Sequence, residues 1–393
     1  MPTSKATIDA AIAARHVMSS AFPVGTADLV GVELELLPVT ADGGRPDHGL
    51  VAEVVAGFAP PGTGTVVSFE PGGQLELSSR PFPDLDTACS ALAADIAGLS
   101  SALAGAGVGL VGLGLDPGPL PERVRRAPRY DAMEAYFDGL GPEGRVMMRA
   151  TAGLQVNLDC GRGRDWPLLR WGLVHLLGPV LAASFANSPF AGGRPSGWKS
   201  SRLAIWWRLD PTRTAPAGAP GRPPDSWSRY ALDAHVMCIR PAAGSGTAPG
   251  SRERFVPLSR PFSFRRWLSE GHELGFPGLD DLDYHLTTLF PPVRPRGWLE
   301  LRMPDSLPDP WWRVPVAVAT ALLYDAQAAE MAAWGARHTT GLWVEAARAG
   351  LAHPGLASAA RCCFRAAQEA LARLGTDPVT QAVVADYAQR YVE

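Results

Sequence analysis

The stretch GVELEL, residues 31–36, decides the fold, and it lies within a longer alternating segment at residues 28–39. Apolar and polar residues that alternate with a period of two predict a β-strand with two unlike faces. The valine and the two leucines would pack against helices, whereas Glu33 and Glu35 would project together from the other face. Neighbouring carboxylates repel each other unless solvent or a cation compensates them. The strand is therefore either an ordinary solvated surface or part of a Mg²⁺ site.

Three further segments repeat this division into an apolar and a polar side, and the first of them predicts a strand, a Pro-Gly-Gly turn and a second strand within residues 65–80. The segments are FEPGGQLELS (69–78), LQVNLD (154–159) and WLELR (298–302). Their polar positions are Glu70, Gln74, Glu76, Ser78, Gln155, Asn157, Asp159, Glu300 and Arg302. Each segment alone is compatible with half-exposed sheet. Together they predict a curved sheet with acids, amides and an arginine on one face.

The order of the other elements favours an α+β fold with an antiparallel sheet, because strands come early and in the middle and do not alternate regularly with helices. Residues 310–393 form an alanine-rich helical part of a single domain that spans 1–393. Predicted helices cover 6–21, 85–104, 129–138, 165–186, 284–290, 310–335, 340–351, 356–374 and 377–391. Predicted strands cover 28–39, 65–80, 145–159 and 298–305, with a glycine-rich strand, VGLVGLGLDP, that begins at 108. Residues 50–60 fit either type, 187–227 are loops around a short helix, and 241–253 are a flexible insertion.

Composition excludes several classes of protein. The 393 residues are 46% hydrophobic, which is typical of a globular chain, and a net charge of −3 gives no basic nucleic-acid footprint. No apolar run approaches the roughly 20 residues of a membrane helix. Asp9, Arg15 and His16 interrupt the apolar core that a signal peptide needs. Five scattered cysteines without a CxxC pair indicate a reducing compartment, and we expect a cytoplasmic protein without a disulfide framework or a structural zinc site.

Familiar catalytic motifs are absent or misplaced. Residues 107–112 match GxGxxG, but they follow a helix and open a strand, which is the reverse of the dinucleotide-binding order. The sequence has no Walker A motif, no HExxH and no GxSxG. His285 is the only histidine near a candidate strand, and a lone histidine of this kind is more often structural. Any catalysis therefore depends on the acidic strands.

Seven segments in a fixed order resemble the glutamate–cysteine ligases of the plant and proteobacterial type, and most of all their actinobacterial members in ergothioneine synthesis. The resemblance spans about residues 28–305, and FEPGGQLELS is its most specific part. The segments are GVELE (31–35), FEPGGQLELS (69–78), RYDAMEAYF (129–137), LQVNLD (154–159), ANSPFAGGRPSGWKSSRLAIW (186–206), RYALDAHVM (229–237) and HLTTLFPPVRPRGWLELR (285–302).

This resemblance implies a glutamine-synthetase-like fold, in which a curved antiparallel sheet forms a funnel covered by helices. It also implies an enzyme that phosphorylates the γ-carboxylate of glutamate with ATP and then lets the amine of cysteine displace phosphate. Mg²⁺ would be the cofactor, and the partners would be small molecules, with neither nucleic acid nor membrane involved. The chemistry needs no protein nucleophile, which agrees with the missing motifs.

Site residues follow from the matching segments. The resemblance makes Glu33, Glu35, Glu70, Glu76 and Glu300 the Mg²⁺ ligands, with Gln155 where some relatives have a histidine. Arg302 would face the ATP phosphates and Arg202 would hold the substrate glutamate, with Asn157 in the same pocket. Tyr130 and Met133 would line the cysteine side. His235, where the family pattern has proline, and the sequence after Arg302 depart from the family. These departures leave two alternatives open, a γ-glutamyl ligase for another amine and a non-catalytic binding protein with this fold.

Overall fold

The computed structural model describes residues 7–23, 28–61, 64–161, 166–218, 222–241 and 255–393. At its centre lies an open antiparallel sheet in the order β10-β11-β5-β1-β3-β2, with β4 paired to the far end of β1. The strands are β1 (Val30–Thr40), β2 (Val66–Phe69), β3 (Leu75–Ser78), β4 (Val108–Val111), β5 (Leu154–Asp159), β10 (Val293–Pro295) and β11 (Trp298–Leu301). Two small hairpins pair β6 (Phe190–Ala191) with β7 (Arg194–Pro195) and β8 (Cys238–Ile239) with β9 (Val256–Pro257).

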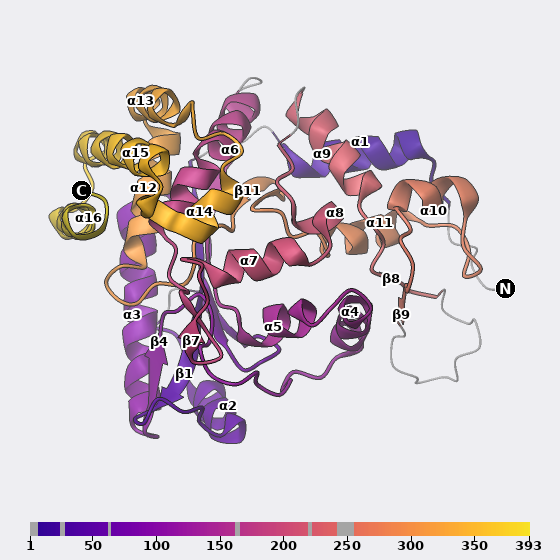
Figure 1. The fold of residues 1–393 in the computed structure, drawn as a ribbon, viewed down its shortest axis with the longest axis horizontal. Coiled ribbons are helices and arrows are strands. Elements are labelled where there is room, and N and C mark those ends of the chain that lie inside the picture. The colour runs from indigo at the N-terminus through magenta and orange to yellow at the C-terminus, as the bar shows by residue number, and fades with distance from the viewer. Residues whose placement is uncertain (1–6, 24–27, 62–63, 162–165, 219–221, 242–254) are drawn as a thin grey trace.

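Helices cover both faces of this sheet. Figure 1 shows α3, α12 and the C-terminal helices on one side and α4, α5 and α7 on the other. The first side comprises α3 (Leu85–Ala104), α12 (Arg313–Tyr324), α13 (Ala326–Ala336), α15 (Pro354–Arg373) and α16 (Pro378–Tyr391). The other helices are α1 (Ala10–Ala21), α2 (His48–Gly57), α4 (Pro128–Asp138), α5 (Glu143–Ala150), α6 (Trp166–Ser184), α7 (Ser201–Arg208), α8 (Pro211–Thr214), α9 (Pro223–Asp233), α10 (Phe264–Glu270), α11 (Leu279–Leu286) and α14 (Trp343–Ala349). The predicted α+β class, an antiparallel sheet covered by helices, is confirmed.

The alternation in β1 divides the sheet as its sequence predicts. Val32 and Leu34 are fully buried and belong to the main core, which also contains the inward residues of α3 and α12. Burial of one such side chain stabilises the fold by about 1.5–3 kcal/mol. The intervening glutamates project from the opposite face, toward α4 and α5. The apolar face thus anchors the strand and leaves the acidic face for a site.

One predicted strand is wrong in its first half. Residues 145–159 are expected to be continuous strand, but they divide into α5 and β5. In α5 the buried Gly144, Met147 and Met148 are three and four residues apart, which is helical spacing, and Arg145 lies between them on the outside. Gly144 has no room for a side chain against Phe137 of α4, so the helix is fixed by a close contact that periodicity does not reveal.

Other boundaries also differ from the expectations. The helix expected at 310–335 is broken at Asp325, whose side chain caps α13 by accepting a hydrogen bond from the backbone N–H of Ala328. Residues 187–227 contain α8 and the start of α9 besides the short helix α7, and a proline begins each of the two. The undecided segment at 50–60 is helical up to Gly57, where α2 ends. The insertion at 241–253 falls outside the described residues, apart from its first residue.

The expectation that no apolar run approaches membrane length is wrong for helix α3. Its 20 residues are long and apolar enough to cross a membrane, by length and composition alone. The helix packs against β1, β4 and α12, and its buried residues include Leu92, Leu99 and the acidic Asp95. These contacts are those of a core helix in a globular protein.

Candidate active site

The polar face of the sheet borders a cavity of about 380 Å³. Nine of the residues expected from the sequence to bind metal or substrates line it, and they come from β1, the β2–β3 turn, β3, α4, β5, α7 and the chain after β11. They are Glu33, Glu35, Glu70, Glu76, Tyr130, Met133, Gln155, Arg202 and Arg302. Asn157 and Glu300 do not line it.

Glu35 lies at the centre of the acidic part of the cavity. The register of β1 and β3 places it directly opposite Glu76, so two carboxylates face each other across neighbouring strands. Its Oε2 atom accepts a hydrogen bond from the Gly153 backbone N–H at 2.6 Å. Burial, together with the charges of Glu70 and Glu76, raises the pKa of Glu35 to about 8. The charge of Arg202 and the hydrogen bond from Gly153 lower the pKa of Glu35, but by less than burial and the two glutamates raise it.

Glu70 reaches the cavity from the start of the Pro-Gly-Gly turn between β2 and β3. The turn is closed by backbone hydrogen bonds from Glu70 N–H to the Gln74 carbonyl and from Gly73 N–H to the Glu70 carbonyl. Gly73 adopts a φ of 95°, and a side chain on Gly72 would overlap the Arg149 backbone carbonyl, so both glycines are required. Burial and the neighbouring Glu76 raise the pKa of Glu70 to about 7, although Arg125 opposes them.

Glu33 lies one step along β1 from Glu35, opposite Gln155 of β5. The pKa of Glu33 is raised, first by burial and then by the charges of Glu300 and Glu76. Asn157 donates a hydrogen bond from its Nδ2 to Glu33 Oε1 at 3.0 Å and accepts one from the Trp298 indole. Asn157 therefore lies beside the cavity, where it orients one of the cavity carboxylates.

Glu300 is fully buried beside the cavity and is held by arginines. Arg294 pairs with both of its oxygens, Nε to Oε2 at 2.5 Å and Nη2 to Oε1 at 3.0 Å, while Arg302 Nη1 lies 3.2 Å from Oε2. Burial alone would raise its pKa, but Arg294 and Arg302 lower the pKa to about 2. Glu300 thus remains ionised with both oxygens engaged, an arrangement that differs from the metal ligand expected from the sequence.

Arg302 and Arg202 form the cationic wall of the cavity. Arg302 donates a hydrogen bond to the Gln155 side-chain oxygen. Arg202 is 5% exposed, and its guanidinium donates to the Arg302 backbone carbonyl at 2.8 Å and lies 3.5 Å from Asp305 Oδ1. Asp305 is itself fixed by the hydroxyls of Ser188 and Ser200 at 2.7 and 2.9 Å. Arg202 is therefore both a cavity residue and a support for the chain that carries Arg302.

The donor set fits a hard divalent cation. Four glutamates that line one cavity present oxygen ligands. Burial, and after it the neighbouring carboxylates, raises the pKa of Glu33, Glu35 and Glu70, so the protein does not fully compensate their charges. Among the described residues, however, no three His, Cys, Asp or Glu side chains are already gathered in the geometry of a metal site. The carboxylates would have to move together to coordinate one ion.

The cavity is also lined by residues that no sequence pattern indicated. They are Arg129, Met147, Met148, Thr151, Thr287, Phe290, Arg294 and Arg296, and Pro71, Gln74 and Trp206 complete the lining. Arg129 is the first residue of the segment RYDAMEAYF. Arg294 faces Glu300 across the β10–β11 hairpin, and the glycine at 297 with a φ of 90° signals that turn. Met147 and Met148 were not expected in the site, because the residues of α5 from 145 onward were wrongly predicted as strand.

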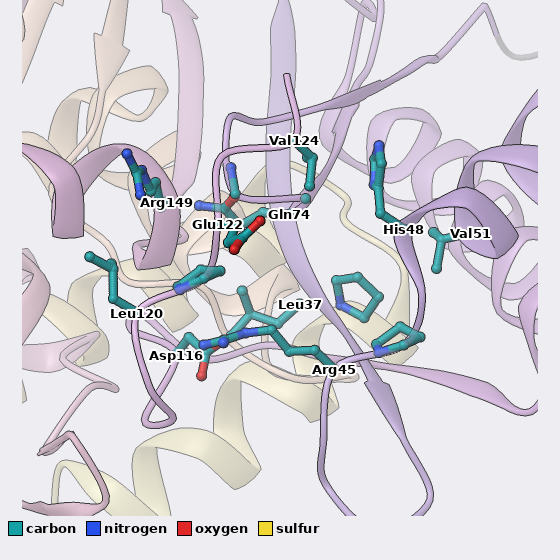
Figure 2. Close-up of a pocket in the computed structure, with 15 residues that line it drawn as sticks. Leu37, Arg45, His48, Val51, Gln74, Asp116, Leu120, Glu122, Val124 and Arg149 are labelled. Carbon is teal, nitrogen blue, oxygen red and sulfur yellow. The ribbon is translucent and has the colours of Figure 1, made fainter. Parts of the chain in front are cut away.

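A second cavity of about 290 Å³ lies on the other side of the Pro-Gly-Gly turn. Gln74 borders both cavities, and its Nε2 donates to the Thr151 backbone carbonyl at 2.8 Å. Figure 2 shows Arg149 on one side of this second cavity and His48 on the other, with Gln74 and Glu122 between them. The turn that carries Glu70 therefore separates the two cavities.

Comparison with known proteins identifies the family of this chain. A family model described as Glutamate-cysteine ligase family 2 (GCS2) matches residues 29–393. The chain is 41% identical over 365 residues to the glutamate–cysteine ligase EgtA of Mycolicibacterium smegmatis, across 91% of this chain and 84% of that protein. It is 32% identical over 277 residues to the chloroplastic glutamate–cysteine ligase of Arabidopsis thaliana, across 66% of this chain and 49% of the plant protein.

Among solved structures, the glutamate–cysteine ligase of Francisella tularensis in complex with AMP aligns with a TM-score of 0.44 at 13% identity, across 95% of this chain and 83% of that one. The family match covers more than nine-tenths of the sequence, including every strand of the acidic face. The sequence resemblance to this family is confirmed. The chain belongs to glutamate–cysteine ligase family 2.

Proposed function

We propose that this protein is an ATP-dependent glutamate–cysteine ligase that works with Mg²⁺ as a single domain. The observation that carries the proposal is the division of one cavity into an acidic wall, built by Glu33, Glu35, Glu70 and Glu76, and a cationic wall that includes Arg302. Such a site suits a reaction in which phosphate groups and carboxylates must be brought together against their mutual repulsion.

The reaction has two steps. A γ-carboxylate oxygen of glutamate attacks the γ-phosphorus of ATP, and ADP leaves. The nitrogen of cysteine then attacks the acyl carbon, phosphate leaves, and the amide of γ-glutamylcysteine forms with release of a proton. Both steps need positioning and charge neutralisation instead of a protein nucleophile.

The residues of the cavity divide these tasks in the proposal. Glu33, Glu35, Glu70 and Glu76 would hold Mg²⁺, with Gln155 beside them, and the cation would neutralise phosphate charge and align the attacking oxygen. Arg302 contacts transferred phosphate oxygens, and Glu300 keeps Arg302 in place. Arg202 binds the glutamate substrate from the base of the cavity, whereas Asn157 orients Glu33.

The finer assignments follow the family and the cysteines. We place the protein in the cytoplasm, because all five cysteines are free and thiols persist in reducing compartments. The similarity to EgtA leads us to propose that its γ-glutamylcysteine serves ergothioneine synthesis.

The test is ADP release by purified protein with ATP and glutamate, to which amines are added one at a time. We expect release that depends on cysteine, stops with EDTA and returns with excess Mg²⁺. Release with a different amine would keep the metal and phosphate chemistry but make the protein a γ-glutamyl ligase for that acceptor. No release with any amine, from protein shown to be folded by circular dichroism, would favour a non-catalytic binding protein.

A further inference from the structure

Arg129 is an arginine of the main cavity without an acidic partner. Within the described part of the chain it forms no ion pair, and its Nε atom is buried without a hydrogen-bond acceptor. Arg294, in contrast, is paired with Glu300, and Arg202 donates to backbone carbonyls and to Asp305. A buried guanidinium donor without an acceptor is costly unless a ligand supplies one.

The surroundings of Arg129 hold it in place without neutralising its charge. It lies in the first turn of α4, and its guanidinium carbon is 5.5 Å from the ring centre of Tyr130 and 6.0 Å from that of Tyr284. Aromatic faces attract a cation and restrict its movement, but they do not accept its in-plane hydrogen bonds. The aromatic rings therefore leave the Nε–H donor of Arg129 without an acceptor.

Arg129 lines the same cavity as Glu70 and Pro71 of the β2–β3 turn. An anion bound to Arg129 would therefore share this cavity with the turn that carries Glu70.

Flexible, apolar methionine side chains line the cavity near Arg129. Met133 of α4 and Met147 and Met148 of α5 line the same cavity as Arg129 and Tyr130. Methionine side chains are flexible and polarisable, so they adapt to the irregular shapes of apolar groups. One guanidinium beside a methionine wall matches a small amino acid, with a carboxylate for the arginine and a thiol or short apolar side chain for the methionines.

We infer that Arg129 binds the carboxylate of the amino-acid acceptor and so restricts the second half-reaction to α-amino acids. This inference rests on the proposed ligase function. A charged hydrogen-bonded pair of this kind contributes about 10- to 100-fold in affinity. Bidentate pairing needs the planar fork of arginine, so lysine at this position would restore only part of the effect.

The experiment compares L-cysteine with cysteamine, which has the same amine and thiol but no carboxylate. Wild-type protein, Arg129→Gln and Arg129→Lys are assayed for ADP release with each acceptor at saturating ATP and glutamate. We expect Arg129→Gln to raise the KM for cysteine about 10- to 100-fold and to leave the KM for cysteamine unchanged, so that the preference of the wild type for cysteine collapses. Arg129→Lys should be intermediate.

Two controls separate the outcomes. Arg126→Gln alters an exposed arginine of the same segment outside the cavity lining and should behave like wild type. Hydroxylamine trapping of γ-glutamyl phosphate reports folding and the first half-reaction, and it should be unchanged in Arg129→Gln. Equal effects on cysteine and cysteamine, or a raised KM for glutamate or ATP instead, would overturn the role of Arg129. Wild-type protein that forms neither hydroxamate nor ADP would refute the ligase proposal itself, and the acceptor role with it.

Discussion

Among the single residues of the site, Glu35 is needed for the proposed metal site but lowers the stability of the metal-free protein. Its pKa of about 8 lies far above the value of about 4.3 in an unfolded chain. The folded protein therefore binds a proton that the unfolded chain has released, and stability falls as pH rises from about 4.3 to 8. Each unit of such a shift corresponds to about 1.4 kcal/mol. The group that the proposed metal requires is one that destabilises the metal-free fold.

Glu35→Gln should therefore change activity and stability in opposite directions. It removes a negative charge from the Glu70–Glu76 cluster, so in EDTA at pH 8 we expect unfolding to cost at least about 1 kcal/mol more than in wild type. We expect ADP release with Mg²⁺ to fall at least about 100-fold, since one proposed metal ligand is lost. Thermal melts and the ADP assay measure both effects. Glu53→Gln, on the exposed side of α2, is the matched control and should change neither. A variant that loses activity and stability together would assign Glu35 to structure.

Sequence could predict which of these residues share a face but not which of them are already paired. Alternation placed Glu33 and Glu35 together, and the cavity confirms their position. Glu300 obeys the same alternation, yet its oxygens are engaged by Arg294, six residues earlier. That pairing depends on the register of a hairpin, which a pattern with a period of two does not contain. Arg129 carried no pattern at all, because a single arginine in a helix is ordinary by sequence.

At the element scale, the β2–β3 turn is the most tightly constrained part of the site. It positions Glu70, separates the two cavities and is itself packed against the Arg149 backbone carbonyl. Gly72→Ala should lower stability by about 1–3 kcal/mol, since the new methyl group overlaps backbone that cannot move freely. ADP release should fall more than stability does, because Glu70 moves with the turn.

The measurements are urea unfolding and the ADP assay, with Gly172→Ala as the matched control. Gly172 lies in α6, and a methyl group there meets nothing within 4 Å. We expect the control to be neutral or slightly stabilising, because alanine favours the helix. If Gly72→Ala matches this control in both assays, the turn has room to adjust, and its contact with Arg149 does not fix Glu70.

The sequence predicted best those elements in which buried and exposed residues alternate with one constant period along the whole element. β1 and the long helices α3, α15 and α16 agree with their predicted ranges within a few residues. The strand prediction for residues 145–159 was wrong in its first half because α5 is only eight residues long, so its helical spacing spans barely two turns. Its position is set by tertiary contact with α4 through Gly144, and such contacts override local preference.

At the scale of the whole molecule, the order of strands and helices was enough to predict an α+β architecture, because an antiparallel sheet needs no regular crossover helices. The strand order was not predictable. β5 pairs with β1 and β11 pairs with β5, from distant parts of the chain, and these pairings bring Gln155 and Arg302 to the acids of β1. The site is therefore a product of long-range pairing, although its parts are local motifs.

The molecule should also lose stability in acid through buried histidine. His285 is 3% exposed, its ring lies against Phe264, and its Nε2–H donates to the Ala231 carbonyl at 2.8 Å. Burial lowers its pKa to about 3, against about 6.5 in an unfolded chain. Below pH 6.5 the unfolded chain takes up a proton that the folded protein cannot bind, so stability falls as pH falls.

For one such group the linkage amounts to about 2 kcal/mol between pH 7.5 and pH 5. Urea unfolding at these two pH values should therefore show wild type losing about 2 kcal/mol more on acidification than His285→Gln, which has no titrating ring. His338→Gln, at an exposed position, is the control and should lose as much as wild type. Equal losses in wild type and His285→Gln would mean that His285 is protonated in the folded protein and that another group controls acid unfolding. His175, whose pKa burial lowers to about 4, would then be the next residue to replace.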